Sequence, residues 1–163
     1  MAGVLQRIDE AIGLTKNQEY LRALTLFFDV YGGEDPPSPM LSSKTATGLS
    51  FFGLCLALVE KRIKPAIDLC KRAIELQFYS ADHHANLSRV YLAAGNRKKA
   101  LETVEGGLKI HPEDDYLLSV RKMLGVRARP AVPFLDRSNP INVSLGKARR
   151  AKEIAHQETK RKK

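Results

Sequence analysis

Hydrophobic and small residues recur in the middle of the chain with two superimposed periods. Within short segments they lie three and four residues apart, which is the spacing of one face of an α-helix. On a longer scale, Ala66-Ile67 is followed 34 residues later by Ala100-Leu101. The same offset relates the next apolar or small positions: Cys70 and Val104, Ala73 and Gly107, Ile74 and Leu108, Leu76 and Ile110. The sequence therefore predicts tandem helical repeats.

A weaker copy precedes these two. Its alanine is Ala23, which lies 43 residues before Ala66, nine more than the repeat period. The surplus residues fall in 35–43, where three prolines rule out a continuous helix. We therefore expect an inserted loop between the first and second copies.

Each copy has the pattern of two helices joined by a tight turn. One helical face of the third copy carries His84, Leu87, Val90 and Tyr91. Gly95 follows this helix and suits the left-handed turn that ends it. Ala100 and Gly107 are small and allow close packing of the second helix, and Pro112 ends the unit. Helices this short are marginal in isolation, so each hairpin must bury its apolar face on the next.

These residues resemble the tetratricopeptide repeat (TPR) family, whose unit of about 34 residues is a helical hairpin with small residues at set positions. The third copy carries the resemblance at Leu87, Tyr91, Gly95, Ala100, Gly107 and Pro112. The middle copy departs from it, because Phe78 replaces the closing proline and Gly53 lies one position before the family's small residue. The first copy keeps Tyr20, Ala23 and Phe27.

The resemblance implies an all-α fold, namely a right-handed α-solenoid of about three TPR-like hairpins with a capping helix. We expect a helical repeat domain at residues 1–125 and an extension at 126–163. The expected elements of the first domain are hairpins at 4–35, 47–78 and 81–112 and a cap helix at 114–124.

The same resemblance implies that the first helices of successive repeats line a concave face on which peptide segments dock. The groove predicted by carrying positions over is formed by Ile8, Ile12, Phe51, Cys55, Leu58, Asn86 and Arg89. Most of these side chains are apolar, which favours an apolar or amphipathic segment, with Asn86 and Arg89 holding its backbone or an acidic side chain. The predicted function is that of a protein-protein interaction scaffold or adaptor.

Two alternatives stay open for this face. A helix that is hydrophobic all round is commonly buried between its neighbours, so Phe51 and Cys55 can equally belong to the core. An apolar face that is exposed must instead be covered by a partner protein, a second copy of the chain in a homodimer, or the chain's own tail.

Some co-chaperones of the TPR family grip the acidic C-terminus of a chaperone with lysine, asparagine and arginine side chains at fixed positions. The corresponding positions in this chain hold Ile8, Ile12, Phe52, Asp82 and Asn86. Asp82 has the wrong charge for a carboxylate ligand, and the three apolar side chains would leave a buried anion without hydrogen bonds. We therefore do not expect this specificity.

The formal net charge of +9 is concentrated in the extension. Residues 1–120 contain 14 Lys and Arg against 15 Asp and Glu, whereas residues 121–163 contain 13 against 3. Such a basic extension suits contact with nucleic acid or anionic lipid, although a tail that is merely solvated explains the charge as well. The residues predicted for anion contact are Lys147, Arg149, Arg150, Lys152, Lys160, Arg161, Lys162 and Lys163.

The extension begins with an apolar, proline-containing segment. Pro130 and Pro133 predict extended backbone there. The residues expected to pack back onto the repeat domain are Val132, Phe134 and Leu135. Ser138-Asn139-Pro140 is typical of a helix start and predicts a basic helix after it. Residues 133–147 also resemble tails of bacterial TPR proteins, a resemblance that implies no activity.

Catalytic chemistry is not indicated. The sequence has no glycine-rich phosphate loop, HExxH motif or nucleophile elbow, so it predicts no enzyme activity, cofactor, metal site or catalytic residue. Cys55 and Cys70 lie in apolar helical segments and are expected to be packed, free thiols. The longest apolar run, 48–59, has 12 residues, too few to cross a bilayer, and the N-terminus lacks the pattern of a secretory signal. The predicted location is cytoplasmic.

Overall fold

The computed structural model describes residues 2–31, 43–125, 132 and 139–161. In these ranges the chain forms helices and no strand. The contacts divide it into two units, Met1–Gly125 and Val126–Lys163. Each unit is described by itself below.

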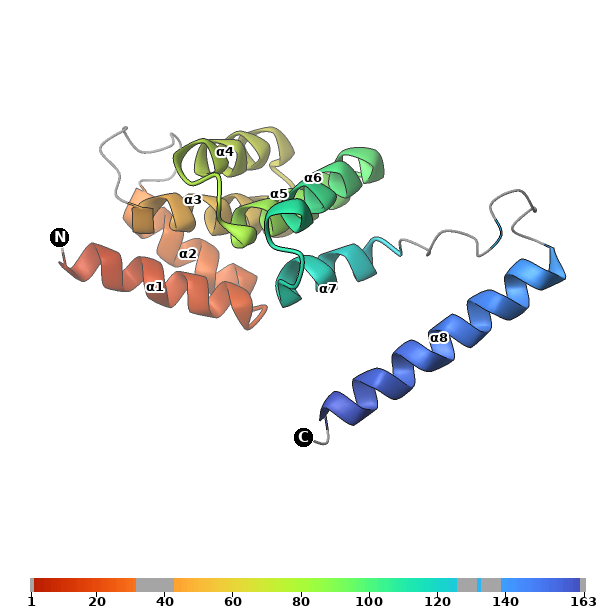
Figure 1. Cartoon of the computed structure of the whole chain (residues 1–163). Coiled ribbons are helices and arrows are strands. Elements are labelled where there is room, and N and C mark those ends of the chain that lie inside the picture. The colour runs from red at the N-terminus through yellow and green to blue at the C-terminus, as the bar shows by residue number, and fades with distance from the viewer. Residues whose placement is uncertain (1, 32–42, 126–131, 133–138, 162–163) are drawn as a thin grey trace. The chain divides into compact units, whose positions relative to one another are not determined.

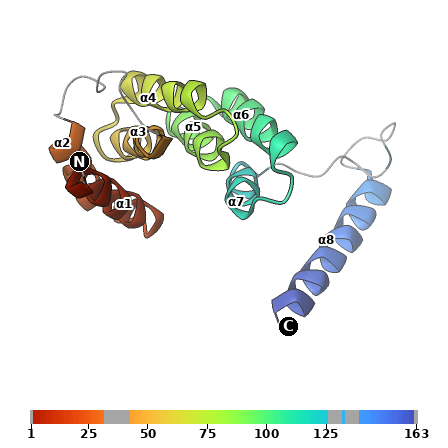
Figure 2. The same cartoon turned by 60° about the vertical axis from the view of Figure 1, so that its left-hand side comes forward.

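The first unit is built from helical hairpins (Figure 1). Their helices are α1 (Ala2–Lys16) and α2 (Tyr20–Tyr31), α3 (Ser43–Cys55) and α4 (Ile63–Leu76), and α5 (Ala81–Ala93) and α6 (Arg97–Ile110), followed by the single helix α7 (Asp115–Met123). The first helices of the hairpins and α7 contact one another in the order α1, α3, α5, α7. Each second helix packs against its own partner and against the next helix of this row (Figure 2). We call the surface formed by α1, α3, α5 and α7 the inner face.

Local sequence explains where the helices of the third hairpin begin and end. Gly95 adopts φ +72°, the left-handed conformation that glycine tolerates, and reverses the chain after α5. The Asn96 side chain then accepts a hydrogen bond from the Lys99 amide at 3.1 Å and caps α6. Asp114 caps α7 in the same way through the Leu117 amide at 2.9 Å. The turns are therefore specified by side chains as well as by packing.

Small residues mark the points where the two helices of a hairpin cross. A Cβ atom on Gly53 would come within 2.7 Å of the Ala66 carbonyl oxygen, so only glycine fits there. At the equivalent place in the third hairpin, the Ser88 hydroxyl donates to the Ala100 carbonyl oxygen at 2.8 Å. Ala66 and Ala100 have no exposed surface. The equally spaced alanines are therefore packing positions, as the repeat predicts.

The middle hairpin contains one extra residue, which its first helix absorbs. Gly53 precedes Ala66 by 13 residues, whereas Ser88 precedes Ala100 by 12. After α3 the helix widens into a π-helical turn, Leu56–Glu60 (η1), and ends at Lys61 with φ +60°. A π-turn closes its hydrogen bonds over one more residue than an α-turn and thus accommodates a one-residue insertion. This explains why Gly53 lies one position before the family's small residue, the departure noted in the sequence of this repeat.

The first and second hairpins meet at an aromatic cluster. The rings of Phe27 and Tyr31 on α2 lie 5.6 and 5.5 Å from the Phe52 ring on α3, measured between centroids. Gly48 lies so close to Tyr31 that a Cβ atom would overlap the phenol oxygen. These contacts bury large apolar surfaces and lock the two hairpins together.

The second unit contains α8 (Pro140–Arg161). The Asn139 side chain accepts from the Ile141 amide at 3.0 Å, so Asn139 is the cap and Pro140 the first helical residue. The Asn142 side chain pairs with both backbone groups of Val132, at 2.8 and 3.1 Å. The predicted packing of Val132 on the repeat domain stays a prediction, and Phe134 and Leu135, for which the same packing is predicted, lie outside the described residues. Among the described helices, none combines the length and hydrophobicity needed to span a bilayer.

Candidate functional site

The structure corrects the expectation of an open, hydrocarbon-lined groove. Four of the predicted groove residues, namely Ile8, Phe51, Cys55 and Asn86, have an exposed fraction of 1% or less. They fill the spaces between neighbouring helices of the inner row, because successive hairpins pack closely enough to cover them. Buried side chains of this kind stabilise the stack and have no surface to offer a ligand.

The remaining predicted groove residues, Ile12, Leu58 and Arg89, are half-buried. Arg89 is the most informative of them, because its charged group connects separate parts of the stack. Its Nη1 donates to the Tyr116 hydroxyl of α7 at 3.0 Å, and its Nη2 donates to the Tyr20 hydroxyl at the start of α2 at 2.7 Å. The guanidinium carbon also lies 5.6 Å from the centre of the Tyr20 ring. The first hairpin, third hairpin and cap helix thus converge on one cation.

Arg89 has no acidic partner within the described part of the chain. The nearby acid on its own helix, Asp82, pairs with Lys16 of α1 at 3.6 Å. Burial is the largest single influence on Arg89 and acts to lower its pKa. The Tyr116 and Tyr20 hydroxyls stabilise the charged guanidinium, and together they outweigh burial, so the pKa of Arg89 is raised above its ordinary value. Burial raises the pKa of Tyr116, although the positive charge of Arg89 opposes this. Tyr116 therefore stays neutral near pH 7, and Arg89 stays charged.

A chain of hydrogen bonds continues from Tyr116 into the core. The Tyr116 hydroxyl donates to Asn86 Oδ1 at 2.7 Å, and Asn86 Nδ2 donates to the Ser50 hydroxyl at 3.2 Å. Ser50 lies 3.0 Å from His83 Nδ1, and His83 Nε2 lies 3.2 Å from Gln77 Oε1. The single hydrogen of the Ser50 hydroxyl is donated to the Thr47 carbonyl oxygen at 3.0 Å, and the direction of the two His83 contacts depends on the tautomer of its ring. The contacts therefore connect Arg89 to Gln77 through buried side chains.

His83 is neutral in this chain. It has no exposed surface, and burial, followed by the neighbouring His84, lowers its pKa from 6.5 to about 4. The two ring nitrogens of this neutral imidazole contact Ser50 and Gln77. The network therefore fixes Arg89 and Tyr116 at the inner face by connecting them to buried Asn86.

The two cysteine thiols lie beside this network and are unreactive. Cys55 and Cys70 are free and buried, as predicted. Burial raises the pKa of Cys55 to about 11, although a hydrogen bond with Thr15 and the charge of Arg89 act in the opposite direction. Burial, followed by the nearby Cys55, also raises the pKa of Cys70. Both thiols are therefore protonated near neutral pH and are poor nucleophiles.

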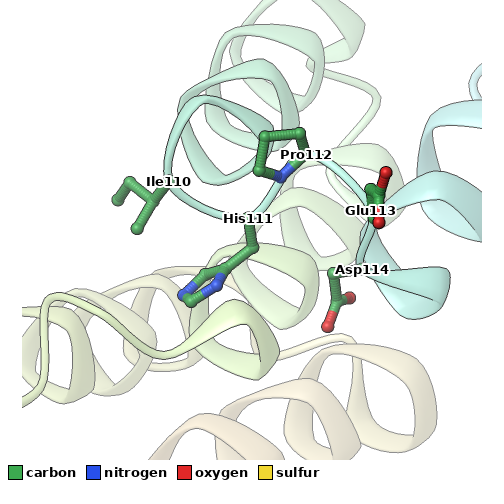
Figure 3. A pocket seen from close by; sticks show the side chains of 5 residues that line it. All are labelled: Ile110, His111, Pro112, Glu113 and Asp114. Carbon is green, nitrogen blue, oxygen red and sulfur yellow. The ribbon is translucent and has the colours of Figure 1, made fainter.

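A shallow hollow of about 460 Å³ lies at the turn between α6 and α7. It is lined by Ile110, His111, Pro112, Glu113 and Asp114, whose side chains fan out from the turn without converging (Figure 3). His111 Nε2 donates a hydrogen bond to the Tyr79 carbonyl oxygen. In the described ranges no three His, Cys, Asp or Glu side chains gather in a way that could hold a metal ion. This hollow has the geometry of a surface turn, not of an active site.

The cationic residues predicted for anion contact belong to the second unit. Lys147 and Lys152 are exposed on α8, and the backbone of Arg149, Arg150, Lys160 and Arg161 is helical. Lys162 and Lys163 lie outside the described residues. Anion binding by these residues stays a prediction.

Sequence reasoning identified Arg89 and Asn86 but missed the tyrosines that organise them. Tyr20 was recognised only as a repeat residue, and the hydroxyl of Tyr116 has no counterpart in a pattern based on apolar spacing. A usable signal was present, because polar side chains at inward-facing helical positions must find hydrogen-bond partners.

The row of inner helices backed by outer helices defines the first unit as an α-solenoid of helical hairpins. Solved structures make this more specific. The chain is similar to the TPR domain of P58(IPK), with 16% identity, a TM-score of 0.56 and coverage of 76% of this chain and 33% of that one. It is also similar to the Sgt2 TPR domain from Aspergillus fumigatus, with 13% identity, a TM-score of 0.57 and coverage of 86% and 93%.

The chain therefore has the tetratricopeptide-repeat fold, and the predicted all-α solenoid is confirmed. It spans about a third of the P58(IPK) chain that it matches. No protein-family model matches the sequence, and no curated protein matches it either.

Proposed function

We propose that this chain is a protein-interaction module that holds a segment of a partner protein on its inner face. The observation that carries the proposal is the convergence of Tyr20, Arg89 and Tyr116 from separate parts of the solenoid. All three side chains keep some exposed surface, while the residues behind them are buried and hydrogen-bonded. Rigid donors and aromatic rings on a preformed surface are typical of recognition sites.

The ligand surface on this proposal is mixed in character. Half-buried Ile12 and Leu58 offer apolar contacts, and Arg89 offers a cation. An amphipathic segment matches this combination better than a purely apolar one, because the large hydrocarbon groups once expected in the groove are enclosed in the core.

Photo-crosslinking in the native host tests the proposal. A photoreactive phenylalanine analogue at Tyr20 should crosslink a partner protein, because this side chain borders the inner face. The matched control places the same group at Leu21, the next residue of α2, which is 68% exposed. Equal crosslinking at the two positions, or crosslinking at Leu21 alone, would contradict the proposed face.

A further inference from the structure

The charge of Arg89 is incompletely matched by the chain itself. A guanidinium group has five N–H donors, and within the described residues Arg89 uses Nη1 and Nη2 to reach neutral phenol oxygens. No described carboxylate forms an ion pair with it. A half-buried cation whose partners are neutral favours an added anion, since charge-assisted hydrogen bonds are roughly twice as strong as neutral ones.

We propose that Arg89 binds the side-chain carboxylate of an Asp or Glu residue in the partner segment. The inference rests on the proposed function and names the ligand chemistry of the same site. Arg89 lies within α5, between α3 and α7 in the inner row. A partner segment that crosses this face therefore brings one of its side chains next to Arg89. Arginine is suited to this role because its planar donors match the two oxygens of a carboxylate.

The surrounding residues hold Arg89 ready for this contact. Tyr20 and Tyr116 fix the guanidinium from two sides, and Tyr116 is itself held by buried Asn86. Little side-chain entropy therefore remains to be lost when a carboxylate arrives. Arg89 therefore presents preformed hydrogen-bond donors to an acidic side chain.

Lys16 and Asp82 influence how strongly the site around Arg89 prefers acidic ligands. Asp82 lies seven residues before Arg89 on α5, a rise of about 10 Å along the helix axis. Its ion pair with Lys16 leaves the exposed atoms of this region with one net positive charge, contributed by Arg89. Replacement of Asp82 by Asn should free Lys16 and strengthen the selection for acidic ligands.

Nucleic acid fits this face poorly. Binding to a phosphate backbone depends on several cations that neutralise successive phosphates. The repeat domain carries almost balanced charge, with 14 Lys and Arg against 15 Asp and Glu in residues 1–120. A single arginine beside an Asp–Lys pair suits one carboxylate.

Selection from a displayed random peptide library on the immobilised full chain provides the test. The wild type should enrich peptides that contain Asp or Glu. The best peptide and its Asn or Gln isostere are then measured against the wild type, with the C-terminus free and amidated. We expect the isostere to bind about tenfold or more weakly, and amidation to have no effect.

Arg89→Gln should remove the preference for acid, so that the acidic peptide and its isostere bind the variant equally. The matched control is Arg97→Gln, which removes the same charge from an exposed position at the start of α6. The comparison of peptide with isostere uses wild-type protein, so it decides the question even when Arg89→Gln folds poorly. Circular dichroism checks the fold of each variant.

The outcomes separate the two proposals. Enriched peptides that are not acidic, or that bind their isosteres equally well, overturn the carboxylate inference and leave the interaction module intact. A requirement for the free C-terminus also overturns it, in favour of a terminal carboxylate. Failure of the library to enrich any peptide on the wild type above an uncoated surface counts against the proposed function itself.

Discussion

At the scale of single residues, two adjacent glycines in α6 have opposite roles. A Cβ atom on Gly107 would approach the His84 Cβ to 2.8 Å and a Leu117 methyl carbon to 2.9 Å. The same atom on Gly106 would meet nothing within 4 Å. Gly107 is therefore required by the crossing of α5, α6 and α7, whereas Gly106 only weakens the helix.

We predict that Gly107→Ala lowers the free energy of unfolding by about 1–3 kcal/mol through overpacking. Its neighbour serves as the control, because Gly106→Ala should raise this free energy by about 0.5–1 kcal/mol. Urea denaturation of the two variants measures both. If both substitutions changed the free energy of unfolding in the same direction, the helix crossing at Gly107 would be looser than described.

The buried imidazole of His83 leads to a second prediction at this scale. Its folded pKa of about 4 lies below the value of 6.5 expected when it is exposed, so the unfolded chain binds the proton more readily. Stability should therefore be unaffected by this group above pH 6.5 and fall as the pH drops from 6.5 towards 4. The loss attributable to His83 is about 3 kcal/mol.

Denaturation of the wild type and of His83→Gln at several pH values isolates this contribution. The variant should lose less stability than the wild type between pH 6.5 and pH 4, whatever its absolute stability. Parallel pH profiles would mean that His83 is protonated as easily in the folded chain as in the unfolded one.

At the scale of elements, the second hairpin shows what repeat spacing predicts and what it leaves out. The 34-residue offset predicted a helical solenoid because small residues must recur where helices cross. Gly53 stood one position out of register in the sequence, but only the backbone shows that the π-turn Leu56–Glu60 absorbs the difference. Spacing reveals that an extra residue exists, and main-chain geometry decides where it is placed.

Deletion of Leu58 should convert the π-turn into a regular turn with a change in unfolding free energy of about 1 kcal/mol or less, because the hairpin then has the 12-residue spacing of its neighbour. Deletion of Ala93 is the control. That hairpin has no surplus residue, so its Ser88–Ala100 crossing must shift and the loss should reach several kcal/mol. Equal losses would contradict the role given to the π-turn.

At the scale of the whole molecule, the face that binds a ligand depends on how closely the hairpins pack. The family resemblance assigned Ile8, Phe51 and Cys55 to the concave face, and the structure buries all three. It could not show that neighbouring hairpins cover these side chains completely, because coverage depends on tertiary packing. The polar cluster around Arg89 remained beyond prediction for the same reason, since it joins residues up to 69 positions apart.

The basic extension contributes a separate property of the molecule. We predict that replacing Lys160, Arg161, Lys162 and Lys163 by Gln leaves the unfolding free energy of the chain unchanged and weakens sedimentation with anionic vesicles at low salt. Neutral vesicles provide the control. Equal sedimentation of the variant and the wild type with anionic vesicles would remove the tail as a lipid-binding segment.

Nuclear magnetic resonance titration of the full chain with a selected acidic peptide tests the central claim most directly. The account predicts that the largest shifts occur at Tyr20, Arg89 and Tyr116 and at their neighbours on α1, α5 and α7. Shifts confined to the α6–α7 turn, to the outer helices or to α8 would contradict the assignment of binding to the inner face.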